Sequence, residues 1–212
     1  HRLTGKKDPA VSRSRRRGEM ATWRTFGIRR GDRVLDVGCG LFPYAFATHL
    51  ADVTATPEWD GRPQRIPTEG RPFYRCSVER LPFAPQSFDF VHCAHVLEHL
   101  HHPARACTEL MRVARRGYIE CPRSWTEHLF SADDHRWLVD WEESTLVFRR
   151  KLPEEYGDVM GVQYRIFDWL EHRPFRVYWN LPSVTRVRNV ELYWEGTFAY
   201  AVVAKRALGP IM

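Results

Sequence analysis

Two groups of acidic and histidine residues follow apolar segments of this chain, and both residue types can bind a charged ligand or move a proton. In the first group, Asp36 lies in the apolar run Val34-Leu35-Asp36-Val37, directly before the turn Gly38-Cys39-Gly40. Glycine lets the backbone turn tightly and approach a ligand closely, while Asp36 supplies a carboxylate. The pattern predicts a site for a nucleotide-like cofactor at the end of a buried strand.

The second group is the run His95-Val96-Leu97-Glu98-His99. Because imidazole titrates near neutral pH, His95 can accept a proton from a hydroxyl or an amine. The run also satisfies the His-x-x-Glu-His pattern of inverted zinc peptidases, in which two histidines hold zinc and the glutamate acts as a base. A five-residue motif often arises by chance, and this one follows a predicted buried strand. We therefore expect no bound metal, a catalytic role for His95, and a capping or packing role for His99.

Other apolar segments predict the elements that position these residues. Residues 87–93 and 117–122 indicate two more buried strands, with a helix over residues 103–114 between them. Strands are also expected at residues 49–54 and 71–76. There is room for only a very short helix after Gly40, and prolines and glycines predict a loop over residues 57–72.

This order of elements resembles the class I S-adenosylmethionine-dependent methyltransferases of the methyltransferase 11 type. The resemblance covers about residues 29 to 122 and is carried by four segments: Val34-Leu35-Asp36-Val37-Gly38-Cys39-Gly40, Glu79-Arg80-Leu81-Pro82-Phe83, Ser87-Phe88-Asp89-Phe90-Val91 with His95-Val96-Leu97-Glu98-His99, and Arg116-Gly117-Tyr118-Ile119-Glu120-Cys121-Pro122. It implies an α/β fold with a Rossmann-like, doubly wound and mostly parallel sheet.

The resemblance implies S-adenosylmethionine as the cofactor. Asp36 would bond its methionine amino group, and the glycine turn would lie close to the cofactor through the backbone of Gly38, Cys39 and Gly40. At the end of the second strand, Asp52 is the first choice for the ribose hydroxyls and Glu58 the second, because a carboxylate offers two acceptors to a vicinal diol.

The adenine-binding turn is expected at residues 77–79. Ser77 stands where the family usually has an acid and can bond the adenine amino group, the Val78 amide can serve a ring nitrogen, and Glu79 opens the next motif. Cys93 and Ala94, at the end of a predicted strand, complete the expected cofactor contacts. The chain departs from the family at Leu41-Phe42-Pro43, where a third small residue is usual.

The chain of 212 residues is expected to form one domain. Its expected parts are an arm and helix over residues 1–28, with the helix at about 18–26, a cofactor-binding core over 29–122, a substrate-binding insertion over 123–186 and a closing region over 187–212. In the insertion, a hairpin is predicted from residues 136–141 and 145–150, and residues 154–171 are expected to be partly helical. In the closing region, residues 187–194 and 198–204 are expected to form an antiparallel hairpin.

The insertion carries further candidates for contact with the acceptor. His135 is the alternate catalytic residue, because related sequences of this type place His and Trp here. Trp125, Trp137 and Trp141 would wall an apolar pocket or form core.

Composition narrows the setting. The five cysteines show no Cys-x-x-Cys pair, so reduced thiols are expected. No apolar run reaches the length of a membrane span, and the first residues given show no signal-peptide core. We therefore expect a cytoplasmic protein without membrane contact. The net charge of +6 includes Arg13, Arg15, Arg16 and Arg17, which we interpret as a solvated segment rather than a nucleic-acid site.

The sequence thus favours a transferase that moves a methyl group from S-adenosylmethionine to an oxygen or nitrogen of a small-molecule acceptor, for example a natural product or a sugar-containing compound. Methylation of RNA or protein is one alternative. A non-catalytic binding subunit that keeps the methyltransferase fold is another. The acceptor and the oligomeric state stay open.

Overall fold

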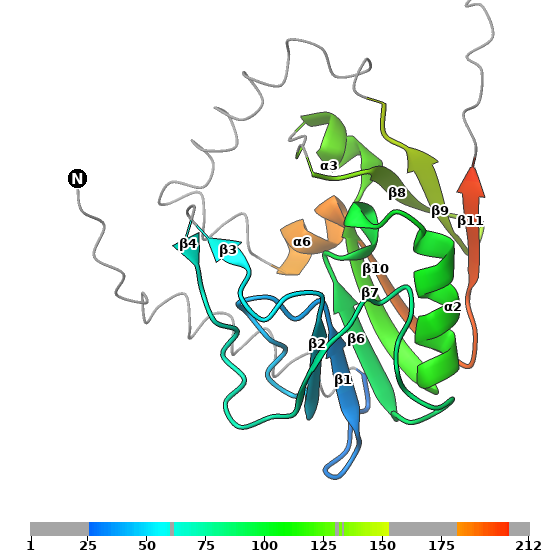
Figure 1. The fold of residues 1–212 in the computed structure, drawn as a ribbon. Helices are drawn as coiled ribbons and strands as arrows, with labels where there is room; N and C mark the ends of the chain where they lie inside the picture. Colours follow the sequence, from blue (N-terminus) through cyan, green and yellow to red (C-terminus); the bar gives the residue numbers. More distant parts are fainter. Residues whose placement is uncertain (1–25, 60–61, 130–131, 133, 153–181, 204–212) are drawn as a thin grey trace, which may run out of the picture.

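The computed structural model describes residues 26–59, 62–129, 132, 134–152 and 182–203 (Figure 1). A six-stranded sheet in the order β10-β7-β6-β1-β2-β5 forms its centre. The strands are β1 (Val34–Val37), β2 (His49–Asp52), β5 (Phe73–Arg75), β6 (Phe90–Ala94), β7 (Arg116–Pro122) and β10 (Asn189–Glu195). All neighbouring pairs are parallel except β10 with β7. The predicted α/β fold with a mostly parallel sheet is confirmed.

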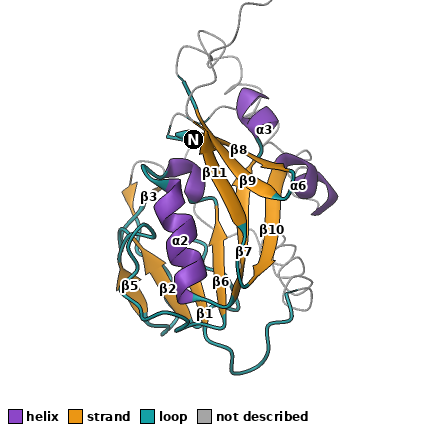
Figure 2. Cartoon of the chain, turned by 90° about the vertical axis from the view of Figure 1, so that its right-hand side faces the viewer, coloured by secondary structure: helices purple, strands orange, loops and turns teal. Residues whose placement is uncertain are grey.

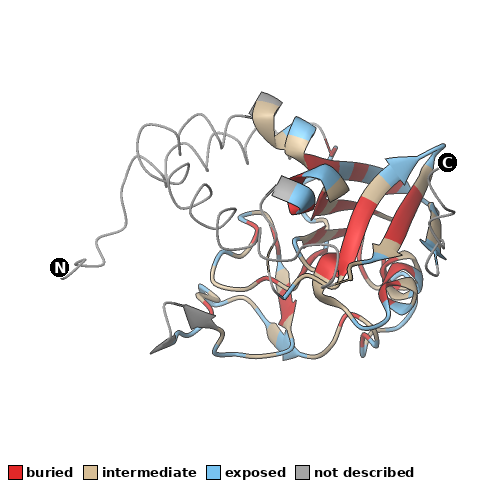
Figure 3. Cartoon of the chain, turned by 90° about the horizontal axis from the view of Figure 1, so that it is seen from above, coloured by how far each residue is buried: buried red, intermediate tan, exposed pale blue. Residues whose placement is uncertain are grey.

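The central strands are apolar on both faces, as parallel strands covered on both sides require. Leu35 and Val37 of β1 belong to the core cluster that contains α2 (Pro103–Val113), whereas Val34 belongs to a second cluster with Phe90 and Tyr118. Figure 3 shows how the buried residues follow the strands, while many residues of the surrounding loops are exposed. This alternation decides which side chains of β1, β6 and β7 face the same way.

Only one of the crossovers between parallel strands is a long helix within the described residues. Helix α2 connects β6 to β7 and starts at proline, as predicted, and it buries Ala106, Cys107, Leu110 and Val113. The very short helix expected after Gly40 is absent, and turns fill this connection. The loop over residues 57–72 contains a two-residue hairpin of β3 (Glu58–Trp59) and β4 (Arg62–Pro63), which was not predicted.

A second sheet in the order β11-β9-β8 covers part of the same face as α2 (Figure 2). It consists of β8 (Trp137–Glu142), β9 (Thr145–Arg150) and β11 (Ala199–Val203). The predicted hairpin of β8 and β9 is confirmed, and its turn uses Glu143 and Ser144 at positive φ. Strand β8 contacts β7 and β10, so this sheet lies over the ends of strands that reach the predicted site.

The prediction that residues 187–194 and 198–204 form a closing antiparallel hairpin is wrong. Strand β10 pairs antiparallel with β7, whereas β11 pairs parallel with β9 in the other sheet. The alternating pattern specified two strands but not their partners. After the turn at Gly196, Phe198 and Tyr200 pack on the core that contains α2, and the Tyr200 hydroxyl lies 3.0 Å from Thr108 Oγ1. This packing takes β11 away from β10.

Three short helices complete the described chain: η1 (Leu97–His99), α3 (Ser124–Leu129) and α6 (Pro182–Arg188). None of the helices that the structure describes is long and apolar enough to cross a lipid bilayer. Three predicted features lie outside the described residues: the arginines at 13 to 17, the helix over residues 18–26 and the partly helical segment 154–171. Of the predicted helix, the structure describes only Phe26.

Candidate active site

Side chains from three neighbouring strands form a polar row on one face of the central sheet. Asp36, His92 and Tyr118 are register partners across β1, β6 and β7. His92 Nδ1 lies 2.8 Å from Asp36 Oδ1, and the Tyr118 hydroxyl donates to Glu120 Oε2 at 2.7 Å. The row leads from the glycine turn to the carboxyl end of β7, where ligands of open α/β sheets bind.

Asp36 lies at the predicted place, but its carboxylate is enclosed. It is 3 % exposed, and its second oxygen accepts a hydrogen bond from the Tyr44 amide at 2.7 Å. The His92 ring stacks on the Tyr44 ring with centroids 4.3 Å apart. Asp36 therefore fixes the return of the glycine turn, and a direct bond to the cofactor stays a prediction.

Gly38 and Gly40 have different roles in the turn, although both have a positive φ. A Cβ on Gly38 would overlap Cγ2 of Val96, so this glycine allows the turn after β1 to contact the segment after β6. A Cβ on Gly40 would meet no atom closer than 4.0 Å. Gly40 therefore faces open space, which fits the close approach of a cofactor to the backbone.

Asp52 closes the same turn from the end of β2. Its Oδ2 accepts the Gly40 amide at 3.0 Å and its Oδ1 the Thr54 amide at 3.2 Å. Each oxygen keeps a second lone pair for a ribose hydroxyl. Glu58, the second choice, belongs to the β3–β4 hairpin, and its side chain lies outside the description. The geometry around Gly40 therefore favours Asp52.

The remaining cofactor candidates offer mostly backbone. Cys93 and Val78 are buried in the core that contains α2, so only their main chain is available. Ser77 Oγ accepts the Glu79 amide at 3.2 Å, and Glu79 Oε1 accepts the His102 amide at 2.9 Å before α2 begins. Glu79 thus secures the start of this helix.

Two other candidates stay close to the strand ends. Burial, with Asp36 and Asp52 nearby, raises the pKa of Cys39 to about 12 and keeps it a thiol. Ala94 ends β6 and is partly exposed.

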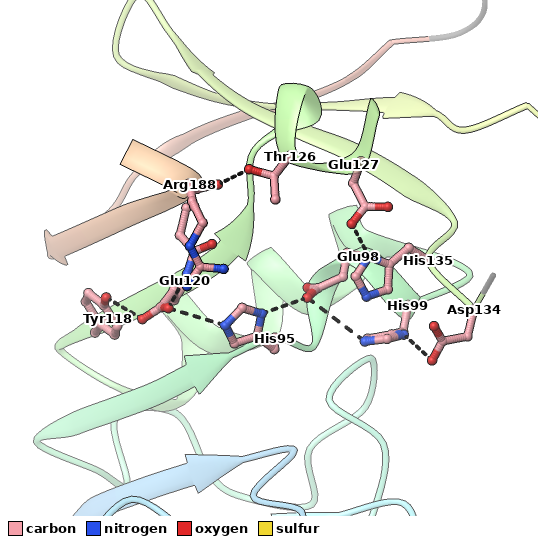
Figure 4. Close-up of polar contacts among 11 residues, drawn as sticks. His95, Glu98, His99, Tyr118, Glu120, Thr126, Glu127, Asp134, His135 and Arg188 are labelled. Carbon is pink, nitrogen blue, oxygen red and sulfur yellow. Dashed lines mark hydrogen bonds and ion pairs between the residues drawn. The ribbon is translucent and has the colours of Figure 1, made fainter. Parts of the chain in front are cut away.

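His95 is held between two carboxylates (Figure 4). Its Nε2 lies 3.3 Å from Glu120 Oε1 and its Nδ1 lies 3.4 Å from Glu98 Oε1. Its φ is +56°, an uncommon value for a residue with a Cβ. Partial desolvation opposes the charge on the ring, but the carboxylates of Glu120 and Glu98 outweigh it and raise the pKa of His95 to about 10. An imidazolium has no lone pair for a further proton, so His95 would have to release its own proton before it could accept one, and its role as a proton acceptor stays a prediction.

Glu120 is the partner that the sequence did not assign. It belongs to the buried strand β7 and receives Asn189 Nδ2 at 2.5 Å in addition to the Tyr118 hydroxyl. Burial would raise its pKa, but His95, Tyr118 and Asn189 lower it to about 2. A charged residue inside an apolar strand was the available signal, because a buried carboxylate needs partners.

His135 joins the same region from the segment before β8. Its Nδ1 lies 2.6 Å from Glu127 Oε1, and Lys151 Nζ lies 3.1 Å from Glu127 Oε2. Burial opposes its charge, yet Glu127 raises the pKa of His135. The structure thus brings both predicted histidines to one edge of the sheet, linked through Glu98 and His99.

The inverted peptidase arrangement is not formed. Only Leu97–His99 are helical, as a single 3-10 turn, so His95 and His99 do not share an α-helical face. Glu98 is fully buried and faces both histidines.

The three tryptophans of the insertion form no common wall. Trp137 is buried and donates from Nε1 to the Leu100 carbonyl at 2.7 Å, whereas Trp125 and Trp141 are 38 % and 37 % exposed. Trp137 is therefore a core residue.

The carboxyl edge suits a cationic nucleoside cofactor. Gly40 leaves open space beside the backbone, Asp52 offers acceptors, and the carboxylates of Glu98 and Glu120 lie at the same edge of the sheet. These residues fit the positive sulfonium and amino groups of S-adenosylmethionine.

Comparisons with known proteins find relatives of this chain among methyltransferases. Residues 35–119 match the sequence profile of a family described as a methyltransferase domain. An uncharacterised protein of Mycobacterium tuberculosis is 37 % identical over 114 residues, which is 50 % of this chain and 42 % of that protein. A ubiquinone/menaquinone biosynthesis C-methyltransferase of Nitrosospira multiformis is 32 % identical over 129 residues, covering 51 % of this chain and 52 % of that protein. The chain spans about half the length of the curated relatives that it matches.

Solved structures of similar chains include the PH0226 protein of Pyrococcus horikoshii, with a TM-score of 0.45, 18 % identity and coverage of 73 % of this chain and 81 % of that one. Another is the magnesium protoporphyrin IX methyltransferase of Synechocystis with bound S-adenosylmethionine, with a TM-score of 0.39, 14 % identity and coverage of 56 % and 65 %. Residues 35–119 therefore match a methyltransferase domain, the kind of domain that the sequence motifs resemble.

Proposed function

From this domain assignment, we propose that the chain transfers the methyl group of S-adenosylmethionine to an oxygen or nitrogen of a small-molecule acceptor. The observation that carries the proposal is the position of His95, Glu98 and Glu120 at the carboxyl edge of β6 and β7, where β8 of the second sheet contacts η1 and β7. The acceptor would bind on the exposed half of the His95 ring, whose side chain is 50 % exposed.

The chain's own residues act mainly by binding and orientation. When bound, the cofactor supplies an electrophilic methyl group on a sulfonium. Gly40 gives it access to the backbone, and Asp52 accepts its ribose hydroxyls. His95 is a positioning residue, because an imidazolium between two carboxylates has no free acceptor nitrogen. Proximity and alignment then supply most of the rate.

The charge of the site limits the kinds of acceptor that can bind. Glu98 and Glu120 lie beside one imidazolium, so the local charge is negative. A neutral amine or hydroxyl fits better than an anion, since methyl transfer moves the positive charge of the sulfonium onto the acceptor, where nearby carboxylates stabilise it until a proton is lost.

A carbon acceptor is the second candidate, favoured by the likeness to the C-methyltransferase of Nitrosospira multiformis. Methylation of RNA or protein depended on the arginines at 13 to 17, which lie outside the described residues. The third alternative, a non-catalytic subunit, is separated from both by measuring turnover.

The decisive experiment combines binding and product analysis. Calorimetry with S-adenosylmethionine and its demethylated product should give binding that weakens about 10-fold to 150-fold in Asp52→Ala, which removes a charge-assisted acceptor worth about 1.5 to 3 kcal/mol. Asp89→Ala is the matched control, because Asp89 accepts the Arg33 amide before β6 begins, at the amino end of the sheet. Isotope-labelled methyl transfer to a panel of amines, hydroxyl compounds and carbon acids, with mass spectrometry, then identifies the acceptor atom. Binding without transfer to any acceptor would support the non-catalytic subunit, and equal binding by Asp52→Ala would contradict the assigned site.

A further inference from the structure

Three side chains from two distant segments meet beside the proposed methyl-transfer site. Glu98 and His99 come from the turn after β6, and His135 precedes β8. Each offers a ligand atom, and the three atoms lie within 4.8 Å of one another. Ligand atoms of a tetrahedral zinc ion are about 3.3 Å apart, given bonds of about 2.0 to 2.2 Å, so small rotations of these side chains would close the set.

In the rings of His99 and His135, the Nδ1 nitrogen pairs with a carboxylate. His99 Nδ1 lies 3.2 Å from Asp134 Oδ2, and His135 Nδ1 lies 2.6 Å from Glu127 Oε1. This leaves each Nε2 for a further ligand, and Figure 4 shows both rings beside the Glu98 carboxylate. Histidines that bind a metal typically donate their other nitrogen to a carboxylate in this way.

The environment of the Glu98 carboxylate indicates a bound cation. The residue is 0 % exposed, and neither carboxylate oxygen makes a hydrogen bond within the described part of the chain. Its contacts with His95 at 3.4 Å and with His99 at 4.0 Å are longer than direct hydrogen bonds. The ion pair with His95 offsets part of the cost of burying this carboxylate, and a metal ion would compensate the rest.

The backbone already holds the two segments together. The Arg136 amide donates to the Glu98 carbonyl at 2.7 Å, and Trp137 Nε1 donates to the Leu100 carbonyl at 2.7 Å. The three candidate ligands are thus positioned by the fold itself.

Contrary to the expectation of no metal drawn from the sequence, we propose that Glu98, His99 and His135 bind one divalent transition-metal ion, with zinc as the best match to two imidazoles and a carboxylate. Asp134 and Glu127 orient the two rings. The ion fastens the β8–β9 hairpin to the carboxyl edge of the central sheet and leaves one coordination position for water or another oxygen ligand. His95 is excluded from the set because both of its nitrogens face carboxylates. The inference rests on these side chains and not on methyl transfer.

The site is tested on the full chain, prepared without metal-affinity resin and stripped with a chelator. Titration with zinc against a chromophoric competitor should give one site per chain, and elemental analysis after gel filtration should give the same stoichiometry. His99→Ala and Glu98→Gln should weaken zinc binding more than about 100-fold, beyond the effect of an outer-shell change, while Asp134→Asn should weaken it about 10-fold to 100-fold. Cobalt should give a tetrahedral ligand-field spectrum that His99→Ala abolishes.

Two neighbours provide the control. His101 and His102 are exposed histidines of the same loop, and the double substitution His101→Ala, His102→Ala should keep full binding. Circular dichroism verifies that every variant is folded, and Asp134, at 74 % side-chain exposure, can be changed without disturbing the core. Equal zinc affinity of the wild type and His99→Ala, or loss of binding only in the His101, His102 variant, would overturn the proposal. Zinc binding without methyl transfer would leave it intact and count against the proposed function alone.

Discussion

The imidazole of His95 and the carboxylate of Glu120 are linked across the ends of β6 and β7, with Nε2 3.3 Å from Oε1. The main chains are linked as well, because the His95 amide donates to the Glu120 carbonyl at 2.8 Å. The left-handed conformation of His95 turns its ring along the edge of the sheet, where Glu98 approaches the other nitrogen. Backbone strain and electrostatic attraction therefore act at one residue, as they often do at functional sites.

We expect Glu120→Gln to lower the pKa of His95 toward its ordinary value of 6.5, because the variant removes the carboxylate that most stabilises the imidazolium. An NMR titration of the His95 ring in the wild type and the variant measures this shift directly. The control is Glu195→Gln, at the far end of β10. A wild-type His95 that titrates near 6.5 would contradict the ion pair.

The same pair predicts how stability depends on pH. Glu120 has a lowered pKa, so its contribution is present above about pH 4.5 and is lost as the pH falls through about 2. His95 has a raised pKa, so its contribution is fully present below about pH 6.5 and is lost as the pH rises through about 10. Denaturant unfolding should therefore show the largest difference between the wild type and the double variant His95→Asn, Glu120→Gln between about pH 4.5 and 6.5. A difference that grows from neutral to alkaline pH would refute this assignment.

The parts predictable from the sequence are those that local patterns specify. The run from Val34 to Gly40 predicts a buried strand and a turn, and the helix over residues 103–114 follows from Pro103 and its apolar spacing. The pairing of β10 and β11 was not predictable in this way, because an alternating strand carries no label for its partner.

The histidine run shows the same limit. His99 and His135 have rings that meet edge to face with centroids 4.5 Å apart, a contact set by the hairpin returning over η1. From the five-residue pattern alone, His95 is the only histidine that could be suggested as the partner of His99. Likewise Glu127 of α3 orients His135 from a segment with no motif. Contacts between distant segments depend on tertiary packing, which residue spacing does not encode.

Substitutions in the glycine turn should separate stability from cofactor binding. Gly38→Ala adds a methyl group that overlaps Val96 and keeps a positive φ, so we expect a loss of about 2 to 4 kcal/mol of unfolding free energy. Gly40→Ala meets only the backbone penalty of about 1 to 2 kcal/mol, but it places a methyl group in the space expected to receive the cofactor. Thermal unfolding and calorimetry measure the two effects.

Adding Val96→Ala to Gly38→Ala provides the control, since it removes the overlapping methyl groups and should restore part of the lost stability. No recovery in this double variant would place the cost in the backbone alone.

Asp36 should behave as a residue that builds the cofactor turn. Its two oxygens bind the Tyr44 amide and His92, so Asp36→Ala leaves a buried amide without its partner. We expect a loss of about 1.5 to 3 kcal/mol of unfolding free energy, together with weaker binding of S-adenosylmethionine because the turn from Gly38 to Tyr44 loses its anchor. Asp89→Ala, which also removes an acceptor for a backbone amide, should lower stability less because its bond is exposed, and should leave binding unchanged. Denaturant unfolding and calorimetry on both variants decide the matter, since a destabilised Asp36→Ala protein with wild-type affinity would mean that the enclosed carboxylate supports the fold without shaping the cofactor site.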